Sequence, residues 1–198
     1  MAQPTGGGES STLLAGIPQS ANSLGSPNAP VTLAYFGDLE CPFCRDFTLA
    51  VLPSIIERWV GTGELAIEYR ALETATRDPD VFVSQQVAAL AAGKQERAWN
   101  FIETFYREQQ EEGSGYVTDP FLERIAREAG GLDLSRWNRD RADPGLASEI
   151  AADEQAALSA GLHGTPSFLI GRSGGEMRVL SPTGPASFDA AIEELLAN

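Results

Sequence analysis

A short apolar strand that runs into a helix carrying two cysteines is the feature that most restricts how this chain can fold. Val31–Phe36 is β-branched and aromatic, which predicts a buried strand. From Pro42 onward, apolar side chains recur at helical spacing as far as Trp59, and Leu65–Leu72 has the composition of a second strand. This order of strand, helix and strand favours two parallel strands joined by a right-handed crossover, and therefore an α/β fold.

The rest of the chain divides into a helical block and a second group of strands. Strand signals are lacking over about 75–162, where three Asp-Pro pairs predict helix starts with Asp as the N-cap. We expect four or five helices there. Ser167–Ile170 and Met177–Leu180 are predicted to form a hairpin, and Ala186–Ala197 an amphipathic helix. The three pairs are Asp78-Pro79, Asp119-Pro120 and Asp143-Pro144.

The first thirty residues differ in composition from the rest. They are rich in Gly, Ser, Pro and Asn and contain one short apolar patch, Leu13–Ile17. This composition predicts a flexible leader followed by a strap that packs locally. The predicted division is a leader over 1–12, an α/β domain formed by 13–74 and 163–198, and an inserted helical subdomain over 75–162.

Composition excludes several classes of protein. With 42% hydrophobic residues, a chain of 198 residues can build a full core, which excludes intrinsic disorder. Its 28 acidic and 14 basic residues give a net charge of −14, which argues against binding to nucleic acid or another polyanion. The apolar runs are far shorter than the roughly 20 residues of a membrane-spanning helix. Two cysteines three positions apart exclude a disulfide-stapled scaffold.

Cys41-Pro42-Phe43-Cys44 is the strongest chemical signal in the sequence. Its position at the strand-to-helix junction puts Cys41 at a helix N-terminus, where unpaired N–H groups and the helix dipole stabilise a thiolate. We therefore predict that Cys41 is the nucleophile and that Cys44, one turn along the same helix face, is the resolving thiol. Pro42 suits the first helical turn because its missing N–H leaves no donor unpaired there.

A single CxxC pair is also compatible with other roles. A structural zinc ion needs four N or S ligands, and the sequence offers only Cys41, Cys44 and His163, so such a site would require carboxylates or a partner chain. An inert structural disulfide is a second alternative. Pro166 stands at the entry to a predicted strand, where the local sequence alone favours an ordinary trans peptide bond.

The combination of these motifs resembles the bacterial DsbA family of thiol–disulfide oxidoreductases. It consists of CPFC in a βαβ unit, a helical insertion, and Gly164-Thr165-Pro166 ahead of two strands and a helix. The resemblance covers about residues 13–198 and implies an α/β, thioredoxin-like fold with an inserted all-helical subdomain. It implies that Cys41 is the solvent-facing reactive cysteine, Cys44 its buried partner, and Pro166 a cis-proline that faces the pair. In the family, the backbone at the Thr165 position pairs with an extended substrate segment.

Two positions depart from the family pattern in ways that affect the redox chemistry. Phe43 stands where the strongest oxidants carry a histidine that stabilises the reactive thiolate. Tyr35 stands where relatives commonly have a buried acid that assists proton transfer, and a tyrosine cannot replace a base of low pKa. We therefore expect a reduction potential between those of the strong oxidants and thioredoxin.

Charged residues near the motif are expected to have smaller effects. Asp38 and Glu40 precede Cys41 and oppose a thiolate, but we expect water to screen them as exposed carboxylates, with Arg45 offsetting part of their charge. His163 lies three residues before Pro166 and could approach the active site, although a single histidine in a loop is more often incidental.

The expected function is thiol–disulfide exchange through Cys41 and Cys44, which introduces or shuffles disulfide bonds in exported proteins. No metal or organic cofactor is expected, only the redox-active pair itself. The resemblance implies unfolded or cysteine-containing exported proteins as substrates, a membrane quinone-linked partner that reoxidises the pair, and an extracytoplasmic location, although no targeting segment is recognisable. The alternatives are a disulfide reductase, or a chaperone-like peptide-binding domain with an inert disulfide.

Overall fold

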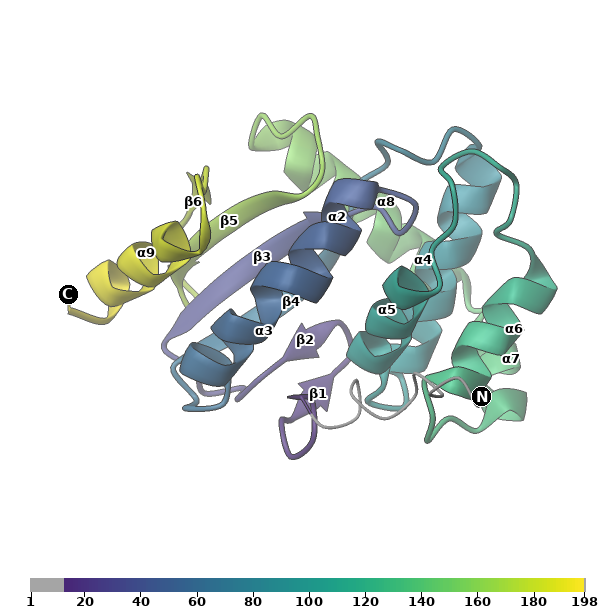
Figure 1. Cartoon of the computed structure of the whole chain (residues 1–198), viewed down its shortest axis with the longest axis horizontal. Coiled ribbons are helices and arrows are strands. Elements are labelled where there is room, and N and C mark those ends of the chain that lie inside the picture. The colour runs from purple at the N-terminus through teal and green to yellow at the C-terminus, as the bar shows by residue number, and fades with distance from the viewer. Residues whose placement is uncertain (1–12, 198) are drawn as a thin grey trace, which may run out of the picture.

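A mixed sheet of six strands forms the centre of the computed structural model, which describes residues 13–197 (Figure 1). The strands lie in the order β1-β2-β4-β3-β5-β6. β3 runs parallel to β4 and antiparallel to β5. The four predicted strands, the parallel pair and the hairpin of β5 and β6 are thereby confirmed. The bounds are β1 Gln19–Ser20, β2 Ser23–Leu24, β3 Val31–Gly37, β4 Leu65–Ala71, β5 Ser167–Arg172 and β6 Met177–Leu180.

β3 lies inside the sheet because it is apolar on both faces. All of its residues except Thr32 are buried. Leu33 and Tyr35 belong to the main core, whereas Ala34 and Phe36 pack in a smaller cluster on the opposite face. A strand that is covered on both faces appears in the sequence as a nearly continuous apolar run, which is the pattern of VTLAYF.

A single helical segment crosses the face of the sheet that is nearer the viewer in Figure 1. It consists of α2 Pro42–Asp46, η1 Phe47–Val51, α3 Leu52–Ile55 and η2 Ile56–Val60, in which η marks wider π-helical turns. Pro53 has no backbone N–H to close an ordinary turn, and the N–H of Leu52 bonds instead to the carbonyl of Phe47, five residues back. The predicted helix is confirmed, and its widened turns were not expected.

Five helices lie between β4 and β5, the upper limit of the predicted number. They are α4 Pro79–Gly93, α5 Ala98–Arg107, α6 Asp119–Glu128, α7 Leu134–Asp140 and α8 Pro144–Ser159. α4 to α7 gather beside the sheet, whereas α8 passes behind it (Figure 1). Asp153 of α8 accepts a hydrogen bond of 3.1 Å from the backbone N–H of Ala71 in β4. α8 therefore covers the second face of the sheet, and the boundaries of the insertion at 75 and 162 stay a prediction.

Two of the three Asp-Pro pairs begin helices as predicted. Asp78 and Asp143 are N-caps whose side chains accept hydrogen bonds from backbone N–H groups of the first turn. At the remaining pair, Asp119-Pro120, the predicted helix start is wrong by one residue. Thr118 is the N-cap there, and its hydroxyl accepts a hydrogen bond from the N–H of Phe121. Asp119 then falls in the first turn, where a negative charge suits the helix dipole.

Aromatic residues of α5 form the core between the helical group and the sheet. They are Trp99, Phe101, Phe105 and Tyr106, each at most 2% exposed. The C-terminal helix α9, Pro185–Ala197, packs through Phe188 and Ile192. Among the helices that the structure describes, none is long and apolar enough to cross a bilayer.

The start of the described chain forms more structure than the sequence predicts. Leu13, Leu14 and Ile17 pack against the core, as expected for a strap. The following β1–β2 hairpin extends the sheet beyond β4, with Ser23 opposite Glu68, and was not predicted because strands of two residues carry no alternating pattern. The predicted leader over 1–12 lies outside the described residues.

Candidate active site

The two cysteines lie where β3 ends and α2 begins, as predicted. Cys41 is the N-cap residue of α2, and Pro42 occupies the first helical position. The backbone N–H of Cys41 donates to the carbonyl of Asp38 at 3.0 Å. Both cysteines are free thiols, so the structure shows the reduced form of the pair.

The two thiols have opposite electrostatic environments. A hydrogen bond from the Cys44 thiol contributes most to lowering the pKa of Cys41 to about 6, and the Thr165 hydroxyl and backbone N–H groups of α2 act in the same direction against the effect of burial. Burial raises the pKa of Cys44 well above its usual range, and its hydrogen bond to Cys41 raises it further. At neutral pH the pair therefore consists of a Cys41 thiolate and a Cys44 thiol.

Cys41 is less exposed than the family resemblance implies. Only 3% of the residue is accessible, so the expectation of a solvent-facing cysteine is wrong for this conformation. Its Sγ lies 3.4 Å from the carbonyl oxygen of Thr165, which covers one side of the sulfur. Cys44 is fully buried, as implied, whereas Phe43 is 70% exposed.

The loop around Thr165 and Pro166 forms the opposite wall of the site. The peptide bond between these two residues is cis, as the resemblance implies. The hydroxyl of Thr165 forms a short hydrogen bond with that of Thr74, from the loop after β4. His163 is exposed and lines a hollow with Pro166, Phe168 and other residues from the start of β5 and the end of β6.

Asp38 and Glu40 are buried, and the expectation that water screens them is wrong. Asp38 is fully buried, and Glu40 is 4% exposed. The carboxylate of Asp38 accepts hydrogen bonds from the backbone N–H groups of residues 74–76, from the hydroxyl of Thr76 and from the N–H of Glu40. These donors replace the water that a buried carboxylate loses.

The environment of Glu40 differs from that of Asp38. Burial raises the pKa of Glu40, and the charges of Asp38 and Glu112 raise it further, although the Thr76 hydroxyl and the N–H of Gly113 oppose this. Arg45 does not offset these charges as expected, because its guanidinium pairs with Asp46 at 2.9 Å on the exposed surface.

A network of neutral hydroxyl groups lies beside Cys44, in place of a buried acid. The hydroxyl of Tyr35 donates to the carbonyl of Cys44 at 3.3 Å and lies 3.1 Å from the hydroxyl of Thr48. The hydroxyl of Tyr106 lies 3.4 Å from that of Tyr35 and donates to the carbonyl of Asp38. Burial raises the pKa of Tyr35 well above its usual value, so Tyr35 stays protonated and cannot act as a base at neutral pH.

Gln109 is a site residue that no sequence signal indicated. Its side-chain amide donates to the carbonyls of Leu39 at 2.7 Å and Cys41 at 3.2 Å. It thereby fastens the loop before α2 to the segment that follows α5. The same segment carries Glu112 and Gly113, which lie near Glu40.

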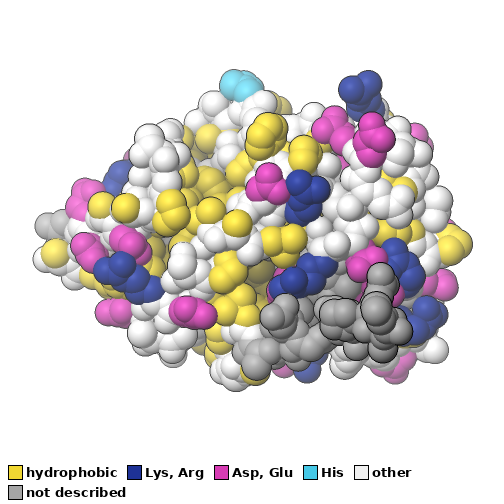
Figure 2. Space-filling model, in the orientation of Figure 1, with side chains coloured by type: hydrophobic (Ala, Val, Ile, Leu, Met, Phe, Trp, Pro, Cys, Tyr) yellow, Lys and Arg dark blue, Asp and Glu magenta, His cyan; other side chains and the backbone are white. Residues whose placement is uncertain are grey.

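Part of the surface near the pair is apolar. Hydrophobic side chains gather over α2 and α3 and along the strip between these helices and α9 (Figure 2). Phe43, the most exposed large apolar residue described, lies next to Cys41. An exposed apolar surface beside a reactive group is suited to contact with another chain.

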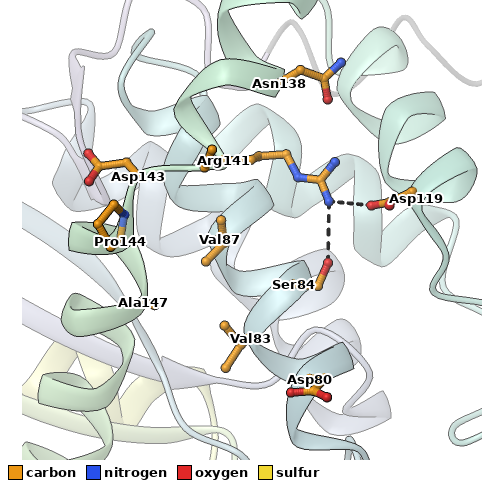
Figure 3. A pocket seen from close by; sticks show the side chains of 11 residues that line it. Asp80, Val83, Ser84, Val87, Asp119, Asn138, Arg141, Asp143, Pro144 and Ala147 are labelled. Atoms are coloured by element: carbon orange, nitrogen blue, oxygen red, sulfur yellow. Dashed lines mark hydrogen bonds and ion pairs between the residues drawn. The ribbon is translucent and has the colours of Figure 1, made fainter.

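A separate hollow lies within the helical group, between α4, α6 and the start of α8. Figure 3 shows Arg141 reaching toward Asp119 and Ser84 there. Its guanidinium lies 2.6 Å from the Asp119 carboxylate and stacks on the ring of Trp137. Because this cation already has an acidic partner, we assign no ligand to this hollow.

Comparison with known proteins identifies the family. A family model described as thioredoxin matches residues 19–194. The chain belongs to the thioredoxin family. A probable disulfide bond formation protein D from Bacillus cereus is 26% identical to this chain over 149 residues, which span 75% of this chain and 68% of that protein.

Solved structures of other proteins have the same fold. BdbD from Bacillus subtilis superposes with a TM-score of 0.77 at 20% identity, covering 92% of this chain and 97% of that one. The α-DsbA1 of Wolbachia pipientis has a TM-score of 0.73 at 20% identity and covers 89% and 90% of the two chains. The protein is a DsbA-type thiol–disulfide oxidoreductase of the thioredoxin family.

Proposed function

We propose that the protein acts as an oxidant, which donates the Cys41–Cys44 disulfide to cysteine-containing proteins outside the cytoplasmic membrane. The observation that supports this direction is the opposite character of the two thiols. Cys41 has a pKa of about 6, whereas burial raises that of Cys44. A thiol of low pKa is a good leaving group, and stabilising its thiolate favours the reduced form of the pair.

The exchange proceeds in two steps that balance two electrons. A substrate thiolate attacks Sγ of Cys41, the bond between Cys41 and Cys44 breaks, and Cys44 leaves and takes up a proton. The second substrate thiolate then attacks the substrate sulfur of the mixed disulfide and displaces Cys41 as a thiolate. The substrate loses two electrons as its disulfide forms, and the enzyme pair gains them.

Thr165 and Pro166 are the proposed substrate-binding residues. The carbonyl oxygen of Thr165 lies 3.4 Å from Sγ of Cys41, and the half-buried loop that carries both residues leads into β5. An extended substrate segment that pairs with the backbone of Thr165 would bring its cysteine to Cys41 by β-augmentation. Backbone pairing gives broad specificity, because it reads no particular side chain. Pro42 begins the helix that carries the pair, and the exposed Phe43 supplies apolar contact beside it.

The proposed cycle requires an external oxidant but no bound metal or organic cofactor. After each turnover both cysteines are reduced, so a second disulfide or a membrane quinone-linked partner must remove two electrons. The expected site of action is extracytoplasmic, because disulfides persist in oxidising compartments.

The decisive experiment measures disulfide transfer to a synthetic peptide that contains two cysteines. The oxidised protein and the reduced peptide are mixed, and the reaction is stopped with an alkylating agent. Mass spectrometry then counts the alkylated thiols of each. We expect stoichiometric transfer, a mixed disulfide trapped by Cys44→Ser with oxidised peptide, and no reaction of Cys41→Ser. Transfer by Cys41→Ser, or no transfer by the unmodified protein, would contradict the proposal.

The direction of the reaction follows from the equilibrium with a glutathione buffer. A potential well above that of thioredoxin, about −270 mV, supports the oxidant. A potential at or below that value would instead favour a reductase or an inert disulfide.

A further inference from the structure

The loop that carries Cys41 is held by two side chains from the end of α5 and the residues that follow it. The side-chain amide of Gln109 donates to the carbonyl of Leu39 at 2.7 Å and to that of Cys41 at 3.2 Å. Tyr106, three residues earlier, donates through its hydroxyl to the carbonyl of Asp38 at 3.2 Å. One short segment of the helical group therefore binds three carbonyls of the turn between β3 and α2.

The direction of the Gln109 amide is determined by its partners. A carbonyl oxygen can only accept, so the NH2 group of the amide must face both carbonyls. That group has two protons, and each has its own acceptor. The acceptors lie two residues apart in the turn, so a shift of either one would break a bond. Gln109 thus fixes the backbone on both sides of Glu40.

The Cys41 carbonyl that Gln109 binds is also the first acceptor of α2. It receives the N–H of Arg45 at 3.1 Å. Cys41 has an extended backbone, with φ of −71° and ψ of 119°, and the helix begins at the next residue. The side chain leaves from the same α-carbon, so the backbone of Cys41 determines where its sulfur lies. That position is at the N-terminus of α2 and 3.4 Å from the carbonyl oxygen of Thr165.

The amide also changes the electrostatic environment of the sulfur. Carbonyl oxygens carry a partial negative charge, which opposes a thiolate nearby, and a bound N–H offsets part of that charge. Leu39 is fully buried and Gln109 is half-buried. Because Leu39 is inaccessible to solvent, water cannot readily replace the donor if the amide is removed.

We propose that Gln109 is a positioning residue for the exchange reaction, which holds the Leu39–Cys41 backbone so that the reactive sulfur stays at the N-terminus of α2. It acts through the two carbonyls rather than on the sulfur itself. Its effect favours the thiolate and therefore the reduced pair, which deepens the oxidant role proposed above and rests on it. The helical group then takes part in the chemistry of the site, because Gln109 lies between α5 and α6.

The experiment measures the pH midpoint of Cys41 alkylation by iodoacetamide in reduced variants of the full chain. Gln109→Met keeps an unbranched side chain of similar length and removes both donors. We expect its midpoint to rise by about half a pH unit, which corresponds to about a threefold loss of thiolate stability. Gln109→Lys carries an ammonium group that can donate to both carbonyls, and its midpoint should be no higher than that of the unmodified protein.

Two other glutamines separate positioning from a general loss of stability. Gln110→Met changes the neighbouring, exposed glutamine and should leave the alkylation midpoint unchanged. Gln19→Met removes a side chain that bonds Asn100 and the N–H of Trp99 at the start of α5. It should lower the denaturant concentration at which the protein unfolds without moving the alkylation midpoint.

Three results would overturn the proposal. They are an unchanged midpoint in Gln109→Met, a rise in Gln109→Lys as large as that in Gln109→Met, and an equal rise in either control variant. Alkylation requires no disulfide exchange, so a failed peptide transfer would reject the proposed function separately.

Discussion

The Sγ of Cys41 lies 3.4 Å from the main-chain oxygen of Thr165, although 124 positions separate the two residues in the chain. The reactive sulfur is thus enclosed between the start of α2 and the loop before β5. Its surroundings combine donors that favour the thiolate with a wall that restricts access. Both properties lead to measurable expectations for the reduced and the oxidised protein.

The reactivity of the reduced protein should depend on pH with a midpoint set by Cys41. Because hydrogen bonds from Cys44, Thr165 and backbone N–H groups lower the pKa of Cys41 to about 6, its alkylation by iodoacetamide should reach half of its maximal rate near pH 6. The Cys44→Ala variant should have a higher midpoint, because it loses the largest of these hydrogen bonds. A midpoint near the ordinary thiol value of about 8.5 in the unmodified protein would contradict the described environment.

The slope of the reduction potential against pH should change near the pKa of Cys41, at about pH 6. Below about pH 6, reduction adds two protons to the pair, so the potential should fall by about 60 mV per pH unit. Above it, Cys41 remains a thiolate while the raised pKa of Cys44 keeps its proton, and the slope should halve to about 30 mV. Equilibration with glutathione over this range measures both slopes, and a constant steep slope up to pH 8 would show that Cys41 is not acidic.

Phe43→His should make the protein a stronger oxidant. A histidine beside Cys41 places a positive charge near the thiolate below about pH 6.5 and favours the charged sulfur. Since Phe43 is 70% exposed, water screens this charge, and the pKa of Cys41 should fall by only about half a unit. Phe43→Gln, which is polar but uncharged, is the control. Equal effects of the two substitutions would assign the change to lost apolar contact.

Tyr35→Phe should weaken the folded protein without adding or removing a base. The substitution removes the hydroxyl that bonds the Cys44 carbonyl and the Thr48 hydroxyl, and it should cost about 1 kcal/mol of unfolding free energy. Denaturant titration of the oxidised protein measures this value. Because Tyr35 stays protonated, the pH profile of peptide oxidation should keep its shape. Loss of one limb of that profile would show that Tyr35 exchanges a proton during catalysis.

Asp38→Ala should be far more destabilising than the loss of an exposed acid. It leaves several buried donors of the loop after β4 without an acceptor, which should cost about 3 kcal/mol. Asp46→Ala removes an exposed partner of Arg45 and should cost less than about 1 kcal/mol. Denaturant titrations of the two variants test the comparison, and similar costs would mean that the Asp38 network contributes little.

The sequence predicted the parts of the fold whose patterns are local. The apolar run of β3, the Pro42 helix start and the two Asp-Pro caps depend on neighbouring residues, and each lies where it was predicted. The β1–β2 hairpin was missed because it exists only through its pairing with β4. The position of α8 behind the sheet likewise depends on contacts such as that between Asp153 and Ala71.

In the site, too, the sequence predicted features that depend on neighbouring residues and missed those that depend on distant contacts. The CPFC motif identified both cysteines, and the family resemblance pointed to Thr165 and Pro166. The burial of Asp38 was missed because its donors come from a loop 36 residues further along, so no neighbour in sequence shows that a carboxylate there is fully bonded. Gln109 was missed for the same reason, since its amide reaches carbonyls about 70 positions earlier.

The sheet order also determines when the site can exist during synthesis. β3 lies between β4, which follows it closely in the chain, and β5, which begins only at residue 167. A chain that is still emerging carries both cysteines long before the strand that completes their surroundings. Until β5 joins the sheet, the pair is two ordinary cysteines in an unfinished protein. During that interval, each new copy is itself an unfolded, cysteine-containing protein, which is the class of substrate that the folded copies are proposed to oxidise.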